Sequence, residues 1–170
     1  LRAVQKPAEK RKRSFGMTED KSDLKARIQT DMQNALRAHD KERLSAIRLI
    51  FSTIRQHEID HAHTEADDAQ VMTILEKMIK QRRDSIAQFT QAGRDELVQQ
   101  EEAEIAIIQT YLPTPLSEPE LDTLIKTAIT QTKATTMKDM GKVMGILKAQ
   151  IQGRAEMGQV GAKIKTLLSS

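Results

Sequence analysis

Apolar residues recur at spacings of three and four along most of this 170-residue chain, and this periodicity constrains the fold more than any other feature. The pattern holds from Ser22 onward, and the alternating β-branched runs expected of half-buried strands are missing. Leu24, Ile28, Met32 and Leu36, for example, fall on one face of a helix. The sequence therefore predicts an all-α protein.

Capping residues divide the periodic pattern into separate helices. Ser22 and Asp40 are suitable N-caps for the first two helices, because a short side-chain oxygen can accept from the unpaired backbone amides of a helix start. Capping-box pairs, in which a cap residue is followed three positions later by an acid or amide, mark three further starts. These pairs are Asp67 with Gln70, Ser117 with Glu120, and Thr136 with Asp139. We also expect a helix from about Asp95 to Tyr111 and a short last helix around Val160.

Two prolines, Pro113 and Pro115, interrupt the helical pattern. Proline lacks a backbone N–H, and it also restricts the residue before it, so this segment forms a stiff non-helical joint. We place a domain boundary there. Residues 17–113 are expected to form a helical, bundle-like N-terminal domain, and residues 114–170 a small three-helix C-terminal domain.

Residues 1–16 carry six basic residues and one acid and have no apolar periodicity, so we expect a disordered basic leader. Met17 fits a natural start. The interpretations of the leader are an extension ahead of that start, a genuine basic arm, or the remnant of an organelle presequence. We expect a cytoplasmic protein of a bacterium, with a mitochondrial location as the alternative, and no association with a membrane, because no apolar run reaches bilayer length.

Several enzyme classes are excluded by residues that the chain lacks. It has no cysteine, which removes disulfides, thiolate zinc sites and cysteine nucleophiles. The Gly141-Lys142 pair is followed by Val143 and has no upstream glycine at the spacing of a phosphate-binding loop. We therefore predict no catalytic residues, no cofactor and no metal site, and a protein that does not catalyse a reaction alone.

One segment, from His57 to His61, matches the HExxH pattern of zinc proteases. A catalytic zinc requires a third protein ligand, and no histidine follows His63. We therefore interpret this segment as structural. Helical geometry places Glu58 near the apolar stripe as a half-buried structural residue. If Glu58 faces the core, it needs a cationic or hydrogen-bonding partner, for which Lys80 and Arg83 are the candidates.

The basic residues are concentrated near the carboxyl end. Residues 133–170 hold seven basic and two acidic residues, a local charge of +5, which is what contact with phosphates requires. With four aromatic residues in the whole chain, recognition would depend on the shape of the RNA backbone rather than on base stacking. The predicted RNA-binding residues are Lys138, Lys142, Lys148, Arg154, Lys163 and Lys165.

A second basic run lies in the middle of the chain. Its members Lys77, Lys80, Arg82 and Arg83 are secondary contact candidates, with a solvated helix face as the alternative interpretation. Three glycines, Gly141, Gly145 and Gly153, are expected to be structural, either ending helices or allowing close approach of another backbone.

Several motifs in order resemble the YqeY family of small helical proteins. The motifs are KMIKQRRDSI at 77–86, AGR at 92–94 and YLP at 111–113, and segments 47–50, 54–60 and 101–105 fit the same pattern. Segments 139–144 and 153–155 also resemble the tail domain of GatB, a subunit of the tRNA-dependent amidotransferase that makes Gln-tRNA and Asn-tRNA. The resemblance covers about residues 20 to 168.

The resemblance implies an amidotransferase-like protein, in a family associated with carbon–nitrogen ligase activity that uses glutamine as amide donor. In GatB the tail is similar to a tRNA-holding arm, whereas ATP use, transamidation and ammonia release belong to other parts of the enzyme. The resemblance thus implies an accessory protein, with tRNA or other RNA and amidotransferase subunits as candidate partners. A helical protein–protein interaction adaptor of the translation or amidotransferase machinery is the alternative.

Overall fold

The computed structural model describes residues 23–169, and within that range every regular element is helical. The all-α prediction is confirmed. The predicted basic leader, the start at Met17 and the Ser22 cap lie outside the described residues. The α-helices are α1 Asp23–Arg37, α2 Lys41–Asp60, α3 Asp68–Gln91, α4 Asp95–Gln109, α5 Glu118–Thr132, α6 Met140–Ile151 and α7 Met157–Leu168, with a 3-10 helix, η1, at Met137–Asp139.

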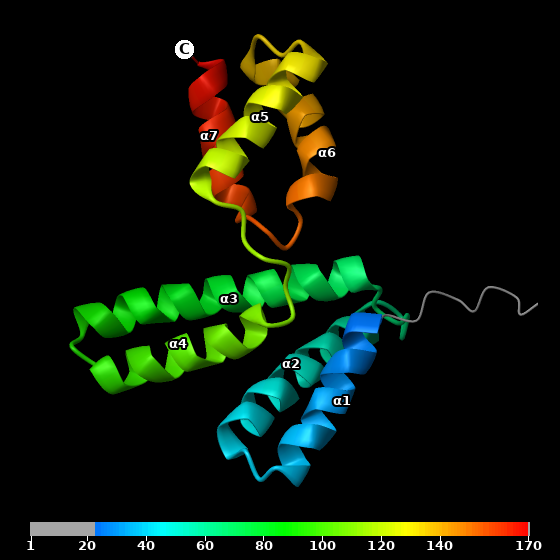
Figure 1. Cartoon of the computed structure of the whole chain (residues 1–170), viewed down its shortest axis with the longest axis vertical. Helices are drawn as coiled ribbons and strands as arrows, with labels where there is room; N and C mark the ends of the chain where they lie inside the picture. Colours follow the sequence, from blue (N-terminus) through cyan, green and yellow to red (C-terminus); the bar gives the residue numbers. More distant parts are fainter. Residues whose placement is uncertain (1–22, 170) are drawn as a thin grey trace, which may run out of the picture.

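Helices α1 to α4 form two antiparallel hairpins, α1 with α2 and α3 with α4, which we call the N-terminal unit (Figure 1). Ile47, Ile50 and Ile54 of α2 are fully buried, and they share one core with Ile28 of α1 and Leu75 of α3. Because these residues recur at three and four, each helix turns a single apolar stripe toward the others.

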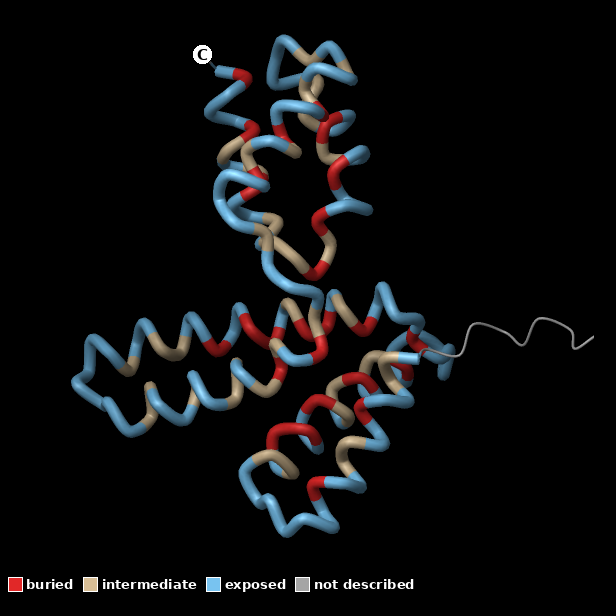
Figure 2. Tube along the Cα trace, viewed as in Figure 1, coloured by how far each residue is buried: buried red, intermediate tan, exposed pale blue. Residues whose placement is uncertain are grey.

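Helices α5 to α7 form the C-terminal unit, which Figure 1 shows standing on the middle of α3. Its core is aliphatic and includes Ile125, Val143, Leu147 and Ile164, all with no exposed surface. Figure 2 shows buried residues along the inner faces of both units and exposed residues along their outer faces. Each unit therefore has its own core.

The predicted caps form the predicted hydrogen bonds. The Asp40 side chain accepts from the Arg43 N–H, and both partners of the capping boxes at Asp67 and Ser117 are engaged. The predicted pair of Thr136 and Asp139 also forms, since the Asp139 carboxylate accepts from the Thr136 N–H, but the helix that it opens is η1, which precedes α6. In the part of the chain that is described, no helix combines the length and apolarity needed to cross a membrane.

Candidate nucleic-acid interface

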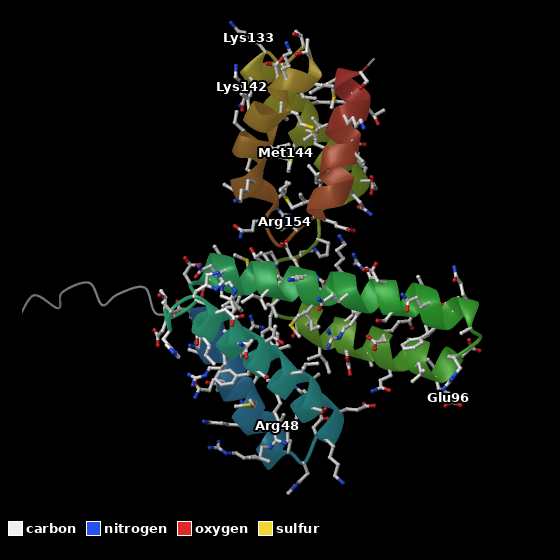
Figure 3. The ribbon with its side chains drawn as sticks, turned by 180° about the vertical axis from the view of Figure 1, so that it is seen from behind. Arg48, Glu96, Lys133, Lys142, Met144 and Arg154 are labelled. Carbon is white, nitrogen blue, oxygen red and sulfur yellow. The ribbon has the colours of Figure 1, made fainter. Side chains whose placement is uncertain are left out.

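Three exposed lysines gather at the end of the C-terminal unit that lies away from α3. Lys133 caps α5 in a left-handed conformation with φ of 54°, Lys138 lies in η1, and Lys142 lies in the first turn of α6. Figure 3 shows Lys133 and Lys142 at this same end. None of the three forms an ion pair among the described residues. We call Lys133, Lys138 and Lys142 the distal lysine surface.

The acid beside these lysines, Asp139, forms hydrogen bonds with the backbone. The Asp139 carboxylate accepts from the N–H groups of Thr135 at 3.0 Å and Thr136 at 3.1 Å. These two backbone hydrogen bonds, in that order, are the main reason that the pKa of Asp139 is lowered, and the nearby Lys142 adds to the effect. Asp139 therefore shapes the turn that presents Lys138 and Lys142.

Two other predicted RNA contacts lie on helices of the same unit. The end of α7, where Lys165 lies in the last turn, adjoins η1, because Ser169 Oγ is 3.8 Å from Met137 Sδ. Lys148 is exposed on α6 but follows Lys142 by six residues, which turns it about 120° away around the helix. Lys165 therefore lies near the distal lysine surface along its helix, whereas Lys148 faces a different direction.

The remaining two predicted contacts are separated from this surface. Lys163 is paired with Glu118 and, at 2.7 Å, with Asp122; hydrogen bonds to Asp122 and Glu118 raise its pKa. Arg154 lies at the other end of the unit (Figure 3), where its Nε donates to the Thr114 carbonyl at 3.1 Å. The predicted RNA-binding residues therefore do not form one continuous surface, because α6 begins next to Lys142 and ends just before Arg154, and its length separates the two.

Among the secondary candidates, Arg82 is not available at the surface. It is 8% exposed, and its Nε lies 2.9 Å from Glu104 and 4.0 Å from Glu101. The reason is helical spacing: Arg82 follows the buried Met78 by four residues and donates to its carbonyl. Arg82 is therefore neither a surface residue that could contact RNA nor part of a solvated helix face.

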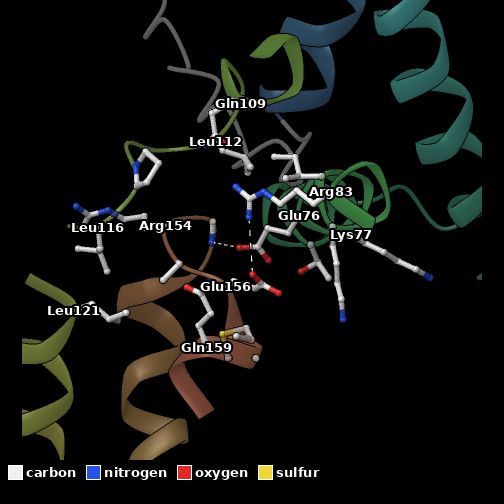
Figure 4. Close-up of a pocket in the computed structure, with 18 of the residues that line it drawn as sticks. Glu76, Lys77, Arg83, Gln109, Leu112, Leu116, Leu121, Arg154, Glu156 and Gln159 are labelled. Carbon is white, nitrogen blue, oxygen red and sulfur yellow. Dashed lines mark hydrogen bonds and ion pairs between the residues drawn. The ribbon is translucent and has the colours of Figure 1, made fainter. Parts of the chain in front are cut away.

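Lys77, Lys80 and Arg83 instead border a groove of about 370 Å³ between α3 and the C-terminal unit. At this junction the Glu76 carboxylate accepts from the Gly153 N–H at 2.5 Å (Figure 4). Burial raises the pKa of Glu76, and the hydrogen bond from Gly153 opposes that rise.

Sequence reasoning missed this groove and the role of Glu76. The contact joins residues 77 positions apart, which no local pattern reveals. The available signal was an acid directly beside the apolar stripe of α3, between the buried Leu75 and Met78.

The predicted structural glycines fall into two kinds. Gly153 has a φ of +75°, and a Cβ there would lie 3.1 Å from Pro113 Cδ, so it both ends α6 and permits close approach of the proline joint. Gly141 and Gly145 face open space, with nothing within 4 Å of an added Cβ. The structure therefore supports tight packing for Gly153 and gives no such contact for Gly141 or Gly145.

The HExxH-like segment has a structural arrangement. Glu58 is 6% exposed and pairs with Lys25 at 2.5 Å, while it also accepts from the Ala66 N–H at 3.1 Å. The core-facing position is as expected, but the expected partners Lys80 and Arg83 are wrong, because α1 packs against α2 and brings Lys25 to the carboxylate. Burial raises the pKa of Glu58, and the bonds from Lys25 and Ala66 outweigh burial and leave it lowered.

The two histidines of this segment stack on each other, with ring centroids 4.1 Å apart. His61 Nδ1 lies 2.8 Å from the His57 carbonyl oxygen. Within the described residues, no group of three or more histidine, aspartate, glutamate or cysteine side chains is placed to hold a metal ion.

The fold and the candidate interface define a small all-α protein with a hairpin-built N-terminal unit and a basic three-helix C-terminal unit. The family model described as "Yqey-like protein" matches residues 25–168. This chain therefore belongs to the YqeY family.

Relatives with this domain carry the name "Altered inheritance of mitochondria protein 41, mitochondrial". The protein from Lachancea thermotolerans is 32% identical over 156 residues, which cover 88% of this chain and 83% of the relative. The protein from Pyrenophora tritici-repentis is 33% identical over 152 residues, covering 85% and 80%. The protein from Vanderwaltozyma polyspora is 34% identical over 119 residues, covering 66% and 64%.

Proposed function

We propose that this protein is an RNA-binding accessory protein, with tRNA as its ligand class, that assists a glutamine-dependent amidotransferase. RNA phosphates contact the distal lysine surface. The supporting observation is that Lys133, Lys138 and Lys142 are exposed at one end of the unit and unpaired within the described residues. Exposed lysines that form no ion pair can contact phosphates and release counterions from the RNA backbone, which is the source of sequence-independent affinity.

The test is the salt dependence of tRNA binding by the full chain. Lys138→Glu with Lys142→Glu should weaken binding and reduce the slope of log affinity against log salt by about two, since roughly one counterion is released per phosphate contact. A fluorescence anisotropy titration at four salt concentrations measures both quantities.

The matched control is Lys41→Glu with Lys126→Glu, which makes the same charge change at two exposed lysines outside the surface. This control should retain most of the slope. An unchanged slope in the Lys138 and Lys142 variant, or an equal loss in both variants, would contradict the proposal.

The amidotransferase connection has its own measurement. The protein alone should give no glutamine- and ATP-dependent transamidation above a blank, because catalysis belongs to the partner enzyme. Recovery of a protein partner that persists after ribonuclease treatment, together with absence of crosslinked RNA, would favour the adaptor function instead.

The location we propose is the mitochondrion, in place of the bacterial cytoplasm. Its support is the printed name of the relatives, which describes those proteins as mitochondrial. Cell fractionation of the natural full-length protein tests it, and recovery with cytosolic markers alone would contradict it.

A further inference from the structure

We propose that the groove between α3 and the C-terminal unit binds a nucleoside monophosphate group, either as a free mononucleotide or as the terminal nucleotide of an RNA strand. This site is distinct from the distal lysine surface. At about 370 Å³ the groove falls within the size range of small-ligand sites, about 300 to 1,000 Å³, and it lies at a junction between units, where such sites concentrate.

The phosphate would be held by one face of α3. Lys80 and Arg83 are three residues apart and Lys77 lies one turn before them, so all three border the groove on neighbouring turns. Lys77 and Lys80 are exposed and form no ion pair among the described residues. Ammonium and guanidinium groups both donate charge-assisted hydrogen bonds to phosphate oxygens, so a dianionic phosphate can accept from all three side chains.

Arg83 is the central donor, and its present partner is weakly held. Its Nη1 is 3.9 Å from Glu156 Oε2, beyond hydrogen-bond distance, and its side chain is 56% exposed. In Figure 4, Arg83 and Glu156 approach each other across the groove. A phosphate could therefore replace Glu156 at the guanidinium without breaking a formed hydrogen bond.

The other acids at the groove are already engaged. Glu76 accepts from the Gly153 N–H at 2.5 Å, and Glu118 pairs with Lys163. Of these three acids, Glu156 is therefore the one that would compete with a phosphate for Arg83.

The body of the ligand would lie against apolar walls with polar edges. Leu112, Leu116 and Met157 line the groove and offer apolar surface to a flat ring. The amides of Gln109 and Gln159 line different sides of it, as Figure 4 shows, and an amide can both donate to and accept from a base edge. A nucleobase joined to a phosphate combines these requirements.

The first experiment titrates the full chain with AMP, adenosine and inorganic phosphate by calorimetry. AMP should bind at least about tenfold more tightly than either fragment, since it uses both the cations and the apolar walls. Lys80→Gln with Arg83→Gln should lower AMP affinity at least about tenfold, because the loss of one hydrogen bond to a charged group lowers affinity by about that factor or more. Lys41→Gln with Arg48→Gln, the same charge change at exposed positions of α2, should leave AMP affinity within about twofold.

A gain of affinity provides the sharpest check. Glu156→Gln removes the competing carboxylate and should tighten AMP binding about two- to fivefold, the range expected for an exposed ion pair. Bound AMP should also protect the amides of residues 153–159 from hydrogen exchange. The proposal that the groove binds a free mononucleotide would be overturned if AMP affinity were unchanged in both variants, the one at Lys80 and Arg83 and the one at Glu156.

A second arm separates the two sources of the nucleotide. If AMP does not bind, the affinity for a single-stranded RNA dodecamer with a terminal phosphate should fall at least about tenfold in the Lys80 and Arg83 variant. That result supports the form of the proposal in which the site binds the end of an RNA strand. RNA binding that responds to the Lys138 and Lys142 variant alone, with no AMP binding, overturns this inference and leaves the proposed function intact. If the Lys80 and Arg83 variant loses AMP binding while the Lys138 and Lys142 variant keeps its full affinity for RNA, the inference is supported and the proposed function is contradicted.

Discussion

The two helical units use charged residues in opposite ways. The N-terminal unit buries Glu58 and Arg82, and each has carboxylate or ammonium partners within 4.0 Å. Among the described residues, the core of the C-terminal unit is aliphatic and contains no buried charge. The lysines of the C-terminal unit lie outside its core, and among residues 23–169 Lys163 is the one lysine of this unit that forms an ion pair, whereas Lys133, Lys138 and Lys142 form none.

This difference separates structural charge from charge that can serve binding. A buried charge must be paired, so the side chains of Glu58 and Arg82 are committed to holding helices together. An unpaired surface lysine contributes little to stability and can contact a ligand. The same residue types therefore have different roles in the two units, and burial with pairing decides which.

The largest effect should come from the aliphatic core. Leu147→Ala should lower the free energy of unfolding by about 4 kcal/mol, because it removes a fully buried side chain and leaves a cavity. Hydrogen exchange measured together with urea unfolding should place the loss in α5 to α7. Ile146→Ala, at a neighbouring exposed position, is the control and should cost far less. Equal loss of protection in α1 and α2 would mean that the units do not differ as described.

The next effect tests the buried charge of the N-terminal unit. Glu58→Ala should cost about 3 kcal/mol, since it leaves Lys25 without the Glu58 carboxylate and the Ala66 N–H without its acceptor. Urea unfolding of the full chain measures it, with the exposed Glu65→Ala as control. A loss below about 1 kcal/mol, within the range of a surface pair, would remove the distinction between the units.

A smaller effect concerns the joint. Gly153→Ala should destabilise the protein by about 1 to 2 kcal/mol, because alanine is strained at a φ of +75° and its Cβ would crowd Pro113. Gly141→Ala in α6, where an added Cβ meets nothing within 4 Å, should instead stabilise by up to about 1 kcal/mol. Thermal unfolding of both variants compares the signs. Two variants with the same sign would contradict the packing role of Gly153.

The smallest effect is a pH dependence. The pKa of Glu58 is lowered in the folded protein, so its contribution to stability is present above the ordinary glutamate pKa of about 4.3 and is lost as the pH falls through the lowered value. Unfolding free energies at pH 7 and pH 3 should therefore differ less in Glu58→Gln than in the unmodified protein. An identical acid-side loss in the two proteins would show that Glu58 does not contribute to it.

Local features of the fold were predictable from the sequence, and long-range contacts were not. The capping boxes at Asp67 and Ser117 depend on residues three positions apart, and both form. The inward position of Glu58 followed from helical spacing alone. Its partner Lys25 lies 33 positions away on another helix. Because no local pattern shows which helix packs against α2, the sequence predicted the wrong partners for Glu58. Arg82 shows the same limit, because its Glu104 partner belongs to the returning helix of a hairpin.

The sequence by itself determined the helices, their caps, the proline joint and the excess of basic residues after position 133, since each depends on spacing or composition within a short segment. Only the tertiary structure decided which cations share a surface. It placed Lys133 and Lys142 together, moved Arg154 to the opposite end and paired Lys163 with two carboxylates. The physical reason is that charge interactions act over a few ångströms in space, and chain folding, not sequence distance, sets those separations.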